Sequence, residues 1–170
     1  SKPYRPIKNT QMKTVRVCHP QERNLHDLVF GGILMREAFE LAFATSAVYC
    51  HGRPLFLAID ELAFVHPVPI GSILEFTASI VYTEFRDDEM VVLMHVQVIA
   101  DVVNVETQNR VTTNTFHLTF KHDASADGQL PNPVQPDTYE EGVLYVEGRR
   151  RLASACQDPR PDPFTATDCL

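Results

Sequence analysis

The sequence predicts a single α+β domain in which a curved antiparallel sheet wraps around one long central helix. The helical segment, residues 31–50, is apolar around most of its circumference, so it must be buried on nearly all sides. Four long β-prone segments follow it with only short turns between them, which makes successive strands antiparallel neighbours. The chain of 170 residues is long enough for one such domain and too short for two ordinary ones.

The elements follow in order from local patterns. A short strand is expected at 13–18, where polar and apolar side chains alternate. The helix ends at His51-Gly52-Arg53-Pro54, where a glycine and then a proline form a helix stop. Strands rich in apolar and β-branched residues come next, separated by turn residues. Their expected ranges are 55–65, 73–85, 89–103 and 110–120.

Polar and proline-rich segments bound this domain. We expect an N-terminal extension, the α+β domain, a linker with a short appended element, and a flexible tail. Their ranges are 1–10, 11–122, 123–151 and 152–170. One sheet cannot enclose a helix completely, so its open side would expose apolar surface. We therefore expect a partner domain to cover that side.

Composition excludes several function classes. The net charge of -7 and a pI near 5.4 argue against nucleic-acid binding, which needs a basic face. Arg36, Glu37 and Glu40 interrupt the best apolar run, so no membrane span is expected. Cysteines, histidines and carboxylates show no metal-ligand spacing, and the four cysteines form no disulfide framework. We expect neither a metal nor a cofactor.

The order of a strand, Val29-Phe30-Gly31-Gly32, a buried helix and four strands resembles the hotdog fold of acyl-CoA thioesterases. The resemblance covers residues 11–151. Within the family, the chain is similar to the second domain of mitochondrial double-hotdog thioesterases. The best-matching segments are CHPQERNLHDLVFGGILMREAFELAFATSA and AIDELAFVHPVPIGSILEFTASIVYTE. TTNTFHLTF and TYEEGVLYVEGRR extend the match almost to the C-terminus.

This resemblance implies a hydrolase of lipid metabolism that cleaves fatty acyl-CoA into free fatty acid and CoA. The CoA thioester is the substrate, and no cofactor takes part. It implies a working pair of hotdog domains, in a homo-oligomer or with a different partner, and membership of a larger assembly. The expected location is the mitochondrial matrix, or otherwise the cytoplasm.

The two glycines at the helix start, Gly31 and Gly32, are candidates for binding the substrate carbonyl. The first N–H groups of a helix lack intrahelical partners, and the helix dipole is positive there. Without a Cβ the backbone can approach a ligand closely, as an oxyanion hole requires. The alternative is that the glycines only let the helix begin against a crowded sheet.

Glu40 is the candidate base or nucleophile. It shares one helix face with Arg36 and Glu37, because the spacings are four and three residues. In the resembling family a helix carboxylate faces a loop Asn or Asp of the partner domain. The alternative is an Arg36–Glu40 ion pair on a solvated surface.

The loop residues Asn24, His26 and Asp27 are candidates to orient the attacking water or to contact the substrate. Turn formation and helix capping are the alternative roles for Asn and Asp at such positions. In many members of the family the loop acid or amide stands at the position that Leu28 occupies here. The helix acid of those members stands at the position of Phe39. A shift of one residue turns a helical side chain by about 100°.

Arg149 and Arg150 belong to the densest basic cluster and are candidates for binding the CoA phosphates, unless they are simply solvated. His95 and His117 are expected to be hydrogen-bonded residues of the sheet. The departures at Leu28 and Phe39 motivate an alternative function, a catalytically inactive thioesterase-like hotdog serving as a structural subunit of a larger mitochondrial assembly. A hotdog dehydratase ranks last, since neither an H-F-P nor a D-x-x-H motif is present.

Overall fold

The computed structural model describes residues 3–29, 31–60, 63–86, 90–125 and 128–157. Its main sheet has the order β2-β5-β6-β7-β3, with the short β4 also paired to β7. All neighbouring strands of this sheet are antiparallel. The strands are β2 (Met12–Val17), β3 (Leu55–Ile59), β4 (Ala63–Phe64), β5 (Ile73–Arg86), β6 (Val91–Val103) and β7 (Arg110–Asp123).

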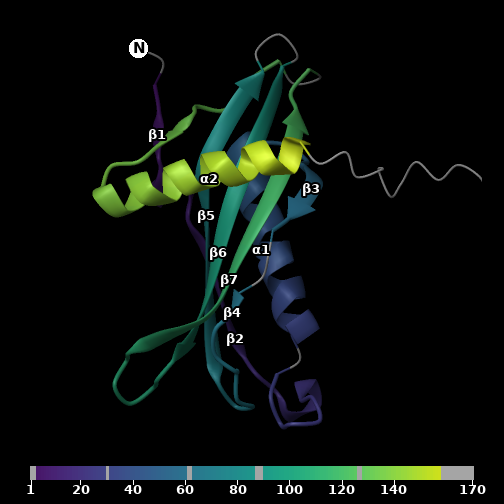
Figure 1. The fold of residues 1–170 in the computed structure, drawn as a ribbon, viewed down its shortest axis with the longest axis vertical. Coiled ribbons are helices and arrows are strands. Elements are labelled where there is room, and N and C mark those ends of the chain that lie inside the picture. The colour runs from purple at the N-terminus through teal and green to yellow at the C-terminus, as the bar shows by residue number, and fades with distance from the viewer. Residues whose placement is uncertain (1–2, 30, 61–62, 87–89, 126–127, 158–170) are drawn as a thin grey trace, which may run out of the picture.

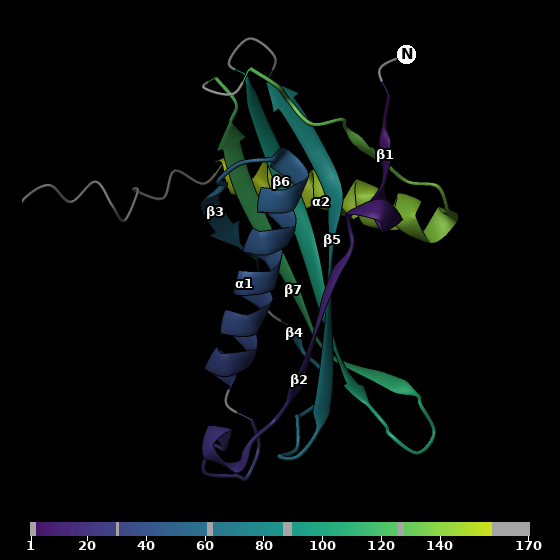
Figure 2. The same cartoon turned by 180° about the vertical axis from the view of Figure 1, so that it is seen from behind.

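Two helices cover opposite faces of this sheet. The long helix α1 (Gly31–Cys50) lies along one face and contacts β2, β5, β6 and β7. The second helix, α2 (Tyr139–Gln157), crosses the other face over β5 and β6 (Figures 1 and 2). The predicted α+β fold, with its antiparallel sheet and single central helix, is confirmed. The predicted helix range of 31–50 coincides with α1.

The core lies between α1 and the sheet. Residues Leu34, Ala38, Leu41 and Ala42 of α1 are buried within it. Alternate residues of each strand point to this face. Those of β5, β6 and β7 in the core include Leu74, Phe76, Ala78, Ile80, Val92, Met94, Val96, Val98, Phe116, Leu118 and Phe120.

Three features differ from the expected elements. The predicted strand 55–65 is divided into β3 and β4, and residues 61–62 lie outside the described residues. Near the N-terminus, the 3₁₀ helix η1 (Ile7–Thr10) buries Ile7, and the Ile80 amide donates to Thr10 Oγ1 at 2.9 Å. A parallel pair, β1 (Arg5–Pro6) with β8 (Val134–Gln135), joins the two ends of the domain.

The appended element is a 19-residue helix, α2, which continues beyond residue 151. Thr138 begins it: its Oγ1 accepts the Glu141 amide at 3.2 Å, and Glu141 accepts the Asp137 amide at 2.7 Å. Such reciprocal capping satisfies amides that the helix itself leaves without partners. The proposed division into 1–10, 11–122, 123–151 and 152–170 stays a prediction, and most of the last range lies outside the described residues.

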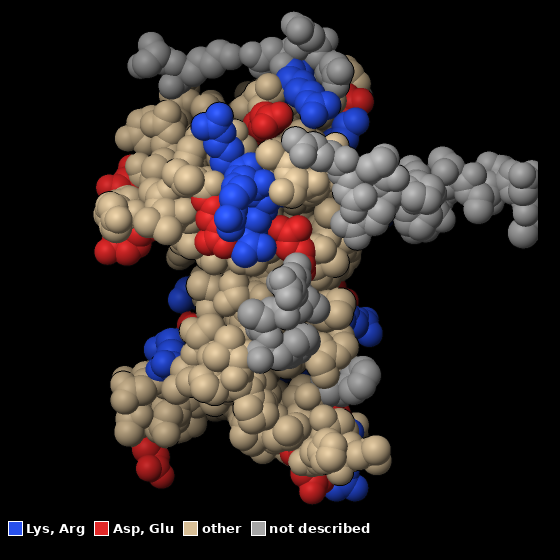
Figure 3. Space-filling view, in the orientation of Figure 1, with Lys and Arg blue, Asp and Glu red and all other residues tan. Residues whose placement is uncertain are grey.

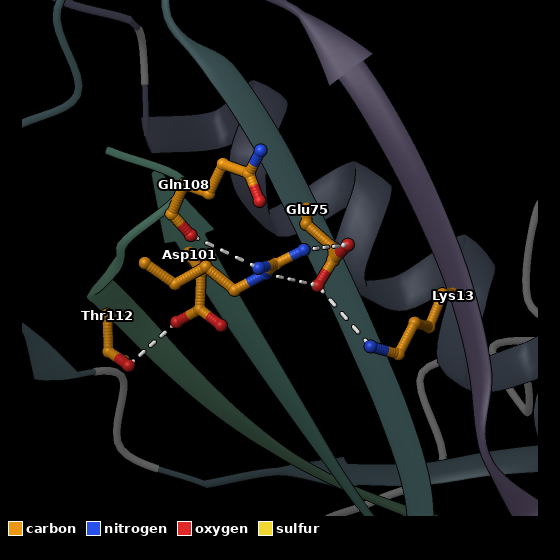
Figure 4. A network of polar contacts seen from close by, with 6 residues as sticks. Lys13, Glu75, Asp101, Gln108 and Thr112 are labelled. Carbon is orange, nitrogen blue, oxygen red and sulfur yellow. Dashed lines mark hydrogen bonds and ion pairs between the residues drawn. The ribbon is translucent and has the colours of Figure 1, made fainter. Parts of the chain in front are cut away.

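Strand register is reinforced on one exposed part of the sheet by a polar network (Figure 4). Glu75 on β5 accepts from Lys13 on β2 at 3.4 Å and from Arg110 on β7 at 3.0 Å. The adjacent Thr112 hydroxyl donates to Asp101 at 2.7 Å. In the described part of the chain, neither helix is long and apolar enough to cross a membrane.

Replacing Gly148 by alanine should loosen α2 from the sheet. A Cβ at this position would lie 2.9 Å from Val81 Cγ2 and 3.0 Å from Tyr82 Cβ. Overpacking of this kind lowers the free energy of unfolding by about 1–3 kcal/mol. The control is Gly142→Ala on the same helix, where a Cβ meets nothing within 4 Å. That variant should be stabilised by about 0.5–1 kcal/mol. Urea denaturation of both variants checks this, and equal effects would contradict it.

Candidate functional site

The candidate site centres on the loop that precedes α1. Arg16 of β2 holds this loop, because its guanidinium pairs with Glu22 of the 3₁₀ helix η2 (Pro20–Glu22) and with Glu37 of α1. All three side chains are largely buried. At the other end of the loop, the Val29 amide donates to the Val68 carbonyl at 2.9 Å. The loop is therefore fixed to both layers of the domain.

Asn24 is tied into this loop through one end of its carboxamide. Its Oδ1 accepts the amides of His26 at 2.8 Å and Leu28 at 3.2 Å. The backbone N–H of Asn24 donates to the Leu28 carbonyl at 2.7 Å. Since the oxygen is used by the loop, the Nδ2 group is the end that remains to serve a ligand. An open hollow of about 530 Å³ is lined by Arg23, Asn24, Leu25 and His26.

α1 begins immediately after this loop at Gly31, which is partly buried, and Gly32, which is exposed. No acidic side chain lies in the first turn of α1. The positive end of the helix dipole is therefore not neutralised by a carboxylate of its own turn. This end of the helix can stabilise an oxygen that gains negative charge.

The three helix charges separate in the structure. Arg36 donates to Glu40 at 2.9 Å, and both side chains are more than half exposed. Glu37 turns instead to Arg16. In a single chain Glu40 thus lies on a solvated face, paired with Arg36. The catalytic role of Glu40 stays a prediction that requires a second domain to cover it.

Phe39, at the position where the resembling family carries its helix acid, belongs to an aromatic cluster. Its ring lies 5.2 Å from that of Phe56 on β3 and 6.0 Å from that of Phe120 on β7, and Phe43 adjoins Phe120. These rings pack edge to face or tilted, which are the arrangements that aromatic pairs prefer. In this chain the position of the family's helix acid is thus occupied by an aromatic side chain that packs against β3 and β7.

Asp27 and His26 are exposed turn residues. Asp27 adopts a left-handed backbone conformation, with φ of 58°, and its carboxylate lies 3.7 Å from Arg23. Asn and Asp tolerate this conformation better than most residues. The structure therefore gives Asp27 a turn function that accounts for its presence. Its role in catalysis stays a prediction, and so does substrate contact by His26.

Arg149 and Arg150 are exposed on α2. Figure 3 shows basic side chains with acidic ones beside them where α2 crosses the sheet. Because α2 and α1 cover opposite faces of the sheet, these arginines do not meet Gly31 and Gly32 within one chain. A CoA site made from both groups would require two chains. The phosphate-binding role of the arginines stays a prediction.

A buried polar cluster under α2 was only partly foreseen from the sequence. His95 Nδ1 lies 3.1 Å from Thr119 Oγ1, and His95 Nε2 lies 3.3 Å from His117 Nδ1. The prediction that both histidines are hydrogen-bonded sheet residues is confirmed. Burial lowers the pKa of His95 to about 3 and also lowers the pKa of His117. Charged side chains of α2 and of the residue that follows β3 lie beside these histidines.

The charged neighbours are Arg151 of α2 with its partners Glu147 and Asp60. Arg151 contacts Glu147 at 2.7 Å and Asp60 at 3.4 Å. The pKa of the Glu147 carboxyl is lowered, first by its hydrogen bond from Arg151. The i, i+4 spacing of Glu147 and Arg151 was the signal that could have found this pair. Among the described residues, no group of three or more His, Cys, Asp or Glu side chains is placed to hold a metal.

The open side of α1 and the adjoining strands carry exposed apolar side chains. On α1 and beside it these are Met35, Val48 and Phe56. Val15 and Val17 of β2 are exposed as well, but they alternate with Arg16, which turns to Glu37 of α1, so they point to the other face of the sheet. Those of β2 and β3 lie on the two edge strands of the sheet. Exposed apolar side chains beside a central helix are typical of an interaction surface. This observation agrees with the expectation of a covering partner.

Comparison with known proteins gives this geometry a context. Human acyl-coenzyme A thioesterase 9, mitochondrial, is 36% identical over 148 residues, which cover 87% of this chain and 31% of the relative. Hop (Humulus lupulus) acyl-coenzyme A thioesterase 2, chloroplastic, is 34% identical over 154 residues, 88% of this chain and 35% of the relative. The chain thus spans about a third of the length of these curated relatives. No family model matches the chain.

Solved structures show the same fold. A Staphylococcus aureus acyl-CoA hydrolase in complex with butyryl-CoA, CoA and CoA disulfide superimposes with a TM-score of 0.75 at 23% identity, covering 89% of this chain and 90% of that one. A hexameric acyl-CoA thioesterase gives a TM-score of 0.75 at 22% identity, covering 90% and 95%. The chain is therefore a hotdog-fold domain whose relatives are acyl-coenzyme A thioesterases.

Proposed function

We propose that the protein hydrolyses fatty acyl-CoA to free fatty acid and CoA, as one half of a hotdog pair. Its relatives carry this activity in their names, and one similar structure binds CoA ligands. The observation that carries the proposal is the loop–helix arrangement: Asn24 uses its Oδ1 for the loop backbone, which leaves its Nδ2 group to a ligand, and this loop leads into a glycine-initiated helix. Two kinds of N–H donor thus come from one short segment.

In the proposed reaction these donors polarise the thioester carbonyl and stabilise the oxyanion of the tetrahedral intermediate. The backbone N–H groups of Gly31 and Gly32 serve the oxygen, and the Asn24 carboxamide orients the attacking water or assists the same oxygen. A carboxylate accepts the proton of the water, and the thiolate of CoA leaves. Glu40 is the helix carboxylate available in this chain, and a second domain would enclose it together with the substrate.

The second hotdog domain in this proposal covers the exposed apolar surface beside α1. Its source is either the remaining part of a longer double-hotdog chain or another copy, since the relatives are about three times as long as the matched segment. Hexameric thioesterases of this fold support an oligomeric arrangement. Arg149 and Arg150 of a neighbouring chain are the candidates for the CoA phosphates. Proposed membership of a larger assembly rests on the same surface.

The proposed location is the mitochondrial matrix. Relatives named as mitochondrial include the human, bovine and mouse thioesterases. The proposed enzyme uses no cofactor, because hydrolysis of a thioester needs only water and preorganised donors. The inactive structural subunit, which the sequence left as an alternative, is not favoured by these comparisons.

The direct test is release of CoA thiol by the purified protein, measured with a thiol-reactive dye across short, medium and long acyl-CoA substrates. Hydrolysis of at least one chain length, reduced in Glu40→Gln, is the expected result. The matched control is Glu106→Gln, an exposed turn carboxylate distant from α1 in the sequence. Absence of hydrolysis by wild-type protein that is folded and oligomeric would overturn the proposal.

A further inference from the structure

Asn114 on β7 is a buried residue whose side-chain polar atoms make no hydrogen bond within the described part of the domain. It is 1% exposed. Neither Nδ2 nor Oδ1 has a hydrogen-bond partner in the structure as described. An amide buried in this way lowers the stability of the fold, because it loses its hydrogen bonds to water and gains none in return. Groups of this kind are rare in native proteins and call for an explanation such as a bound ligand.

The position of Asn114 in the sheet places it on the face that α1 covers. Asn114, Phe116, Leu118 and Phe120 alternate along β7, and the last three belong to the core. Phe120 contacts Phe39 and Phe43 near the middle of α1. Asn114 lies six residues before Phe120, roughly 20 Å along the strand. It therefore lies at one end of the helix rather than at its middle.

Backbone contacts show that this end is the beginning of α1. The amide of Val65, next to β4, donates to the Thr113 carbonyl at 2.9 Å. Three residues later, the Val68 carbonyl accepts the Val29 amide at 2.9 Å, two residues before Gly31. A short segment of chain thus links the strand position of Asn114 to the start of the helix. The strand position of Asn114 is therefore connected to the start of α1 through residues 65–68.

We propose that Asn114 is a substrate-binding residue that hydrogen-bonds the pantetheine arm of CoA. This inference rests on the proposed function. An Asn side chain that lacks partners at both ends offers two N–H donors and one carbonyl acceptor. A thioester carbonyl can satisfy only the donor. The pantetheine arm carries two secondary amides and therefore supplies both donors and acceptors along an extended chain. It is the part of the substrate that matches both ends of Asn114.

Two variants separate this role from a structural one. Asn114→Val removes the orphaned amide and suits a strand, and Asn114→Ala repeats the test with a smaller side chain. The control is Thr113→Val, which removes a neighbouring buried hydroxyl that is already satisfied by the Ala100 carbonyl at 3.1 Å. Free CoA is the probe, because it carries the arm without the acyl chain. Calorimetry gives its affinity, and thermal unfolding gives Tm.

The expected result is a CoA affinity lowered by about tenfold or more in both Asn114 variants, which corresponds to about one hydrogen bond. Their Tm should equal or exceed that of the wild type, because no satisfied bond is lost. Thr113→Val should retain wild-type affinity.

Unchanged affinity in both Asn114 variants overturns the inference, whatever their Tm. Lowered affinity with a lowered Tm in both also overturns it, because a structural partner would then explain the loss. If the wild type hydrolyses acyl-CoA while the variants bind CoA normally, only this inference fails. If the wild type neither binds CoA nor hydrolyses acyl-CoA, the proposed function fails with it.

Discussion

Asn24→Asp should lower kcat for acyl-CoA hydrolysis by about 10²–10³-fold while leaving the fold intact. The substitution keeps an oxygen that accepts the amides of His26 and Leu28, so the loop before α1 is retained. It removes the Nδ2 donor, and loss of one preorganised donor at a developing oxyanion costs about that factor. Thermal unfolding and steady-state kinetics on the same preparation separate the two effects.

The matched control for this change is Asn104→Asp. Asn104 Oδ1 accepts the amides of Glu106 at 3.0 Å and Thr107 at 2.9 Å, so it forms the same kind of turn in the loop between β6 and β7. The control introduces the same charge and should leave kcat unchanged. Equal hydrolysis rates in the wild type and Asn24→Asp would show that Asn24 serves only the loop backbone.

The second large effect concerns pH. The free energy of unfolding should fall as pH is lowered from about 6.5 toward 3, because burial holds the pKa of His95 at about 3. Above pH 6.5 the histidine is neutral in both states, so its full contribution is present. Below pH 6.5 the imidazole of His95 binds a proton in the unfolded state, whereas in the folded state it stays neutral down to about pH 3. Stability is then lost by about 1.4 kcal/mol per pH unit for this one histidine.

The surroundings of His95 explain why it refuses the proton. It is fully buried, His117 stacks on it at a ring distance of 5.4 Å, and Arg151 lies nearby. His117 acts in the same direction, since burial and Arg151 lower its pKa against the opposing effect of Glu147 and Asp60. The whole cluster therefore favours neutral imidazoles.

Urea unfolding between pH 4 and pH 7 measures this dependence. His95→Gln should flatten the slope over that range, because the variant removes the group that takes up the proton on unfolding. His66→Gln, at an exposed position, is the control and should leave the slope unchanged. A slope in His95→Gln as steep as in the wild type would assign the acid sensitivity to the carboxylates instead, for example Glu75, whose pKa is lowered by Arg110.

The sequence predicted the parts of the fold that depend on periodicity and chain punctuation. The bounds of α1 followed from its apolar circumference and from the Gly52-Arg53-Pro54 stop. The helix α2 was expected only as a short appended element, because two glycines and three consecutive arginines weaken its apolar pattern. Its capping residues, Thr138 and Glu141, were the available signal.

The candidate site was less accessible to sequence reasoning, since it depends on contacts distant in the sequence. Arg36, Glu37 and Glu40 were correctly placed on a helix, yet Arg16 of β2 captures Glu37 and leaves Glu40 to Arg36. Helical spacing cannot reveal a competing cation on another strand. The orphaned state of Asn114 likewise depends on what its strand neighbours do not offer, which no local pattern encodes.

The placement of α1 and α2 on opposite faces of the sheet has a kinetic consequence. If Arg149 and Arg150 hold the phosphates of a CoA whose thioester lies at Gly31, the two ends of one substrate molecule rest on different chains. Turnover per milligram would then fall on dilution and recover on concentration, so the rate would rise more steeply than linearly with protein. The specific activity of such an enzyme would depend on its own concentration, because each substrate molecule needs two subunits.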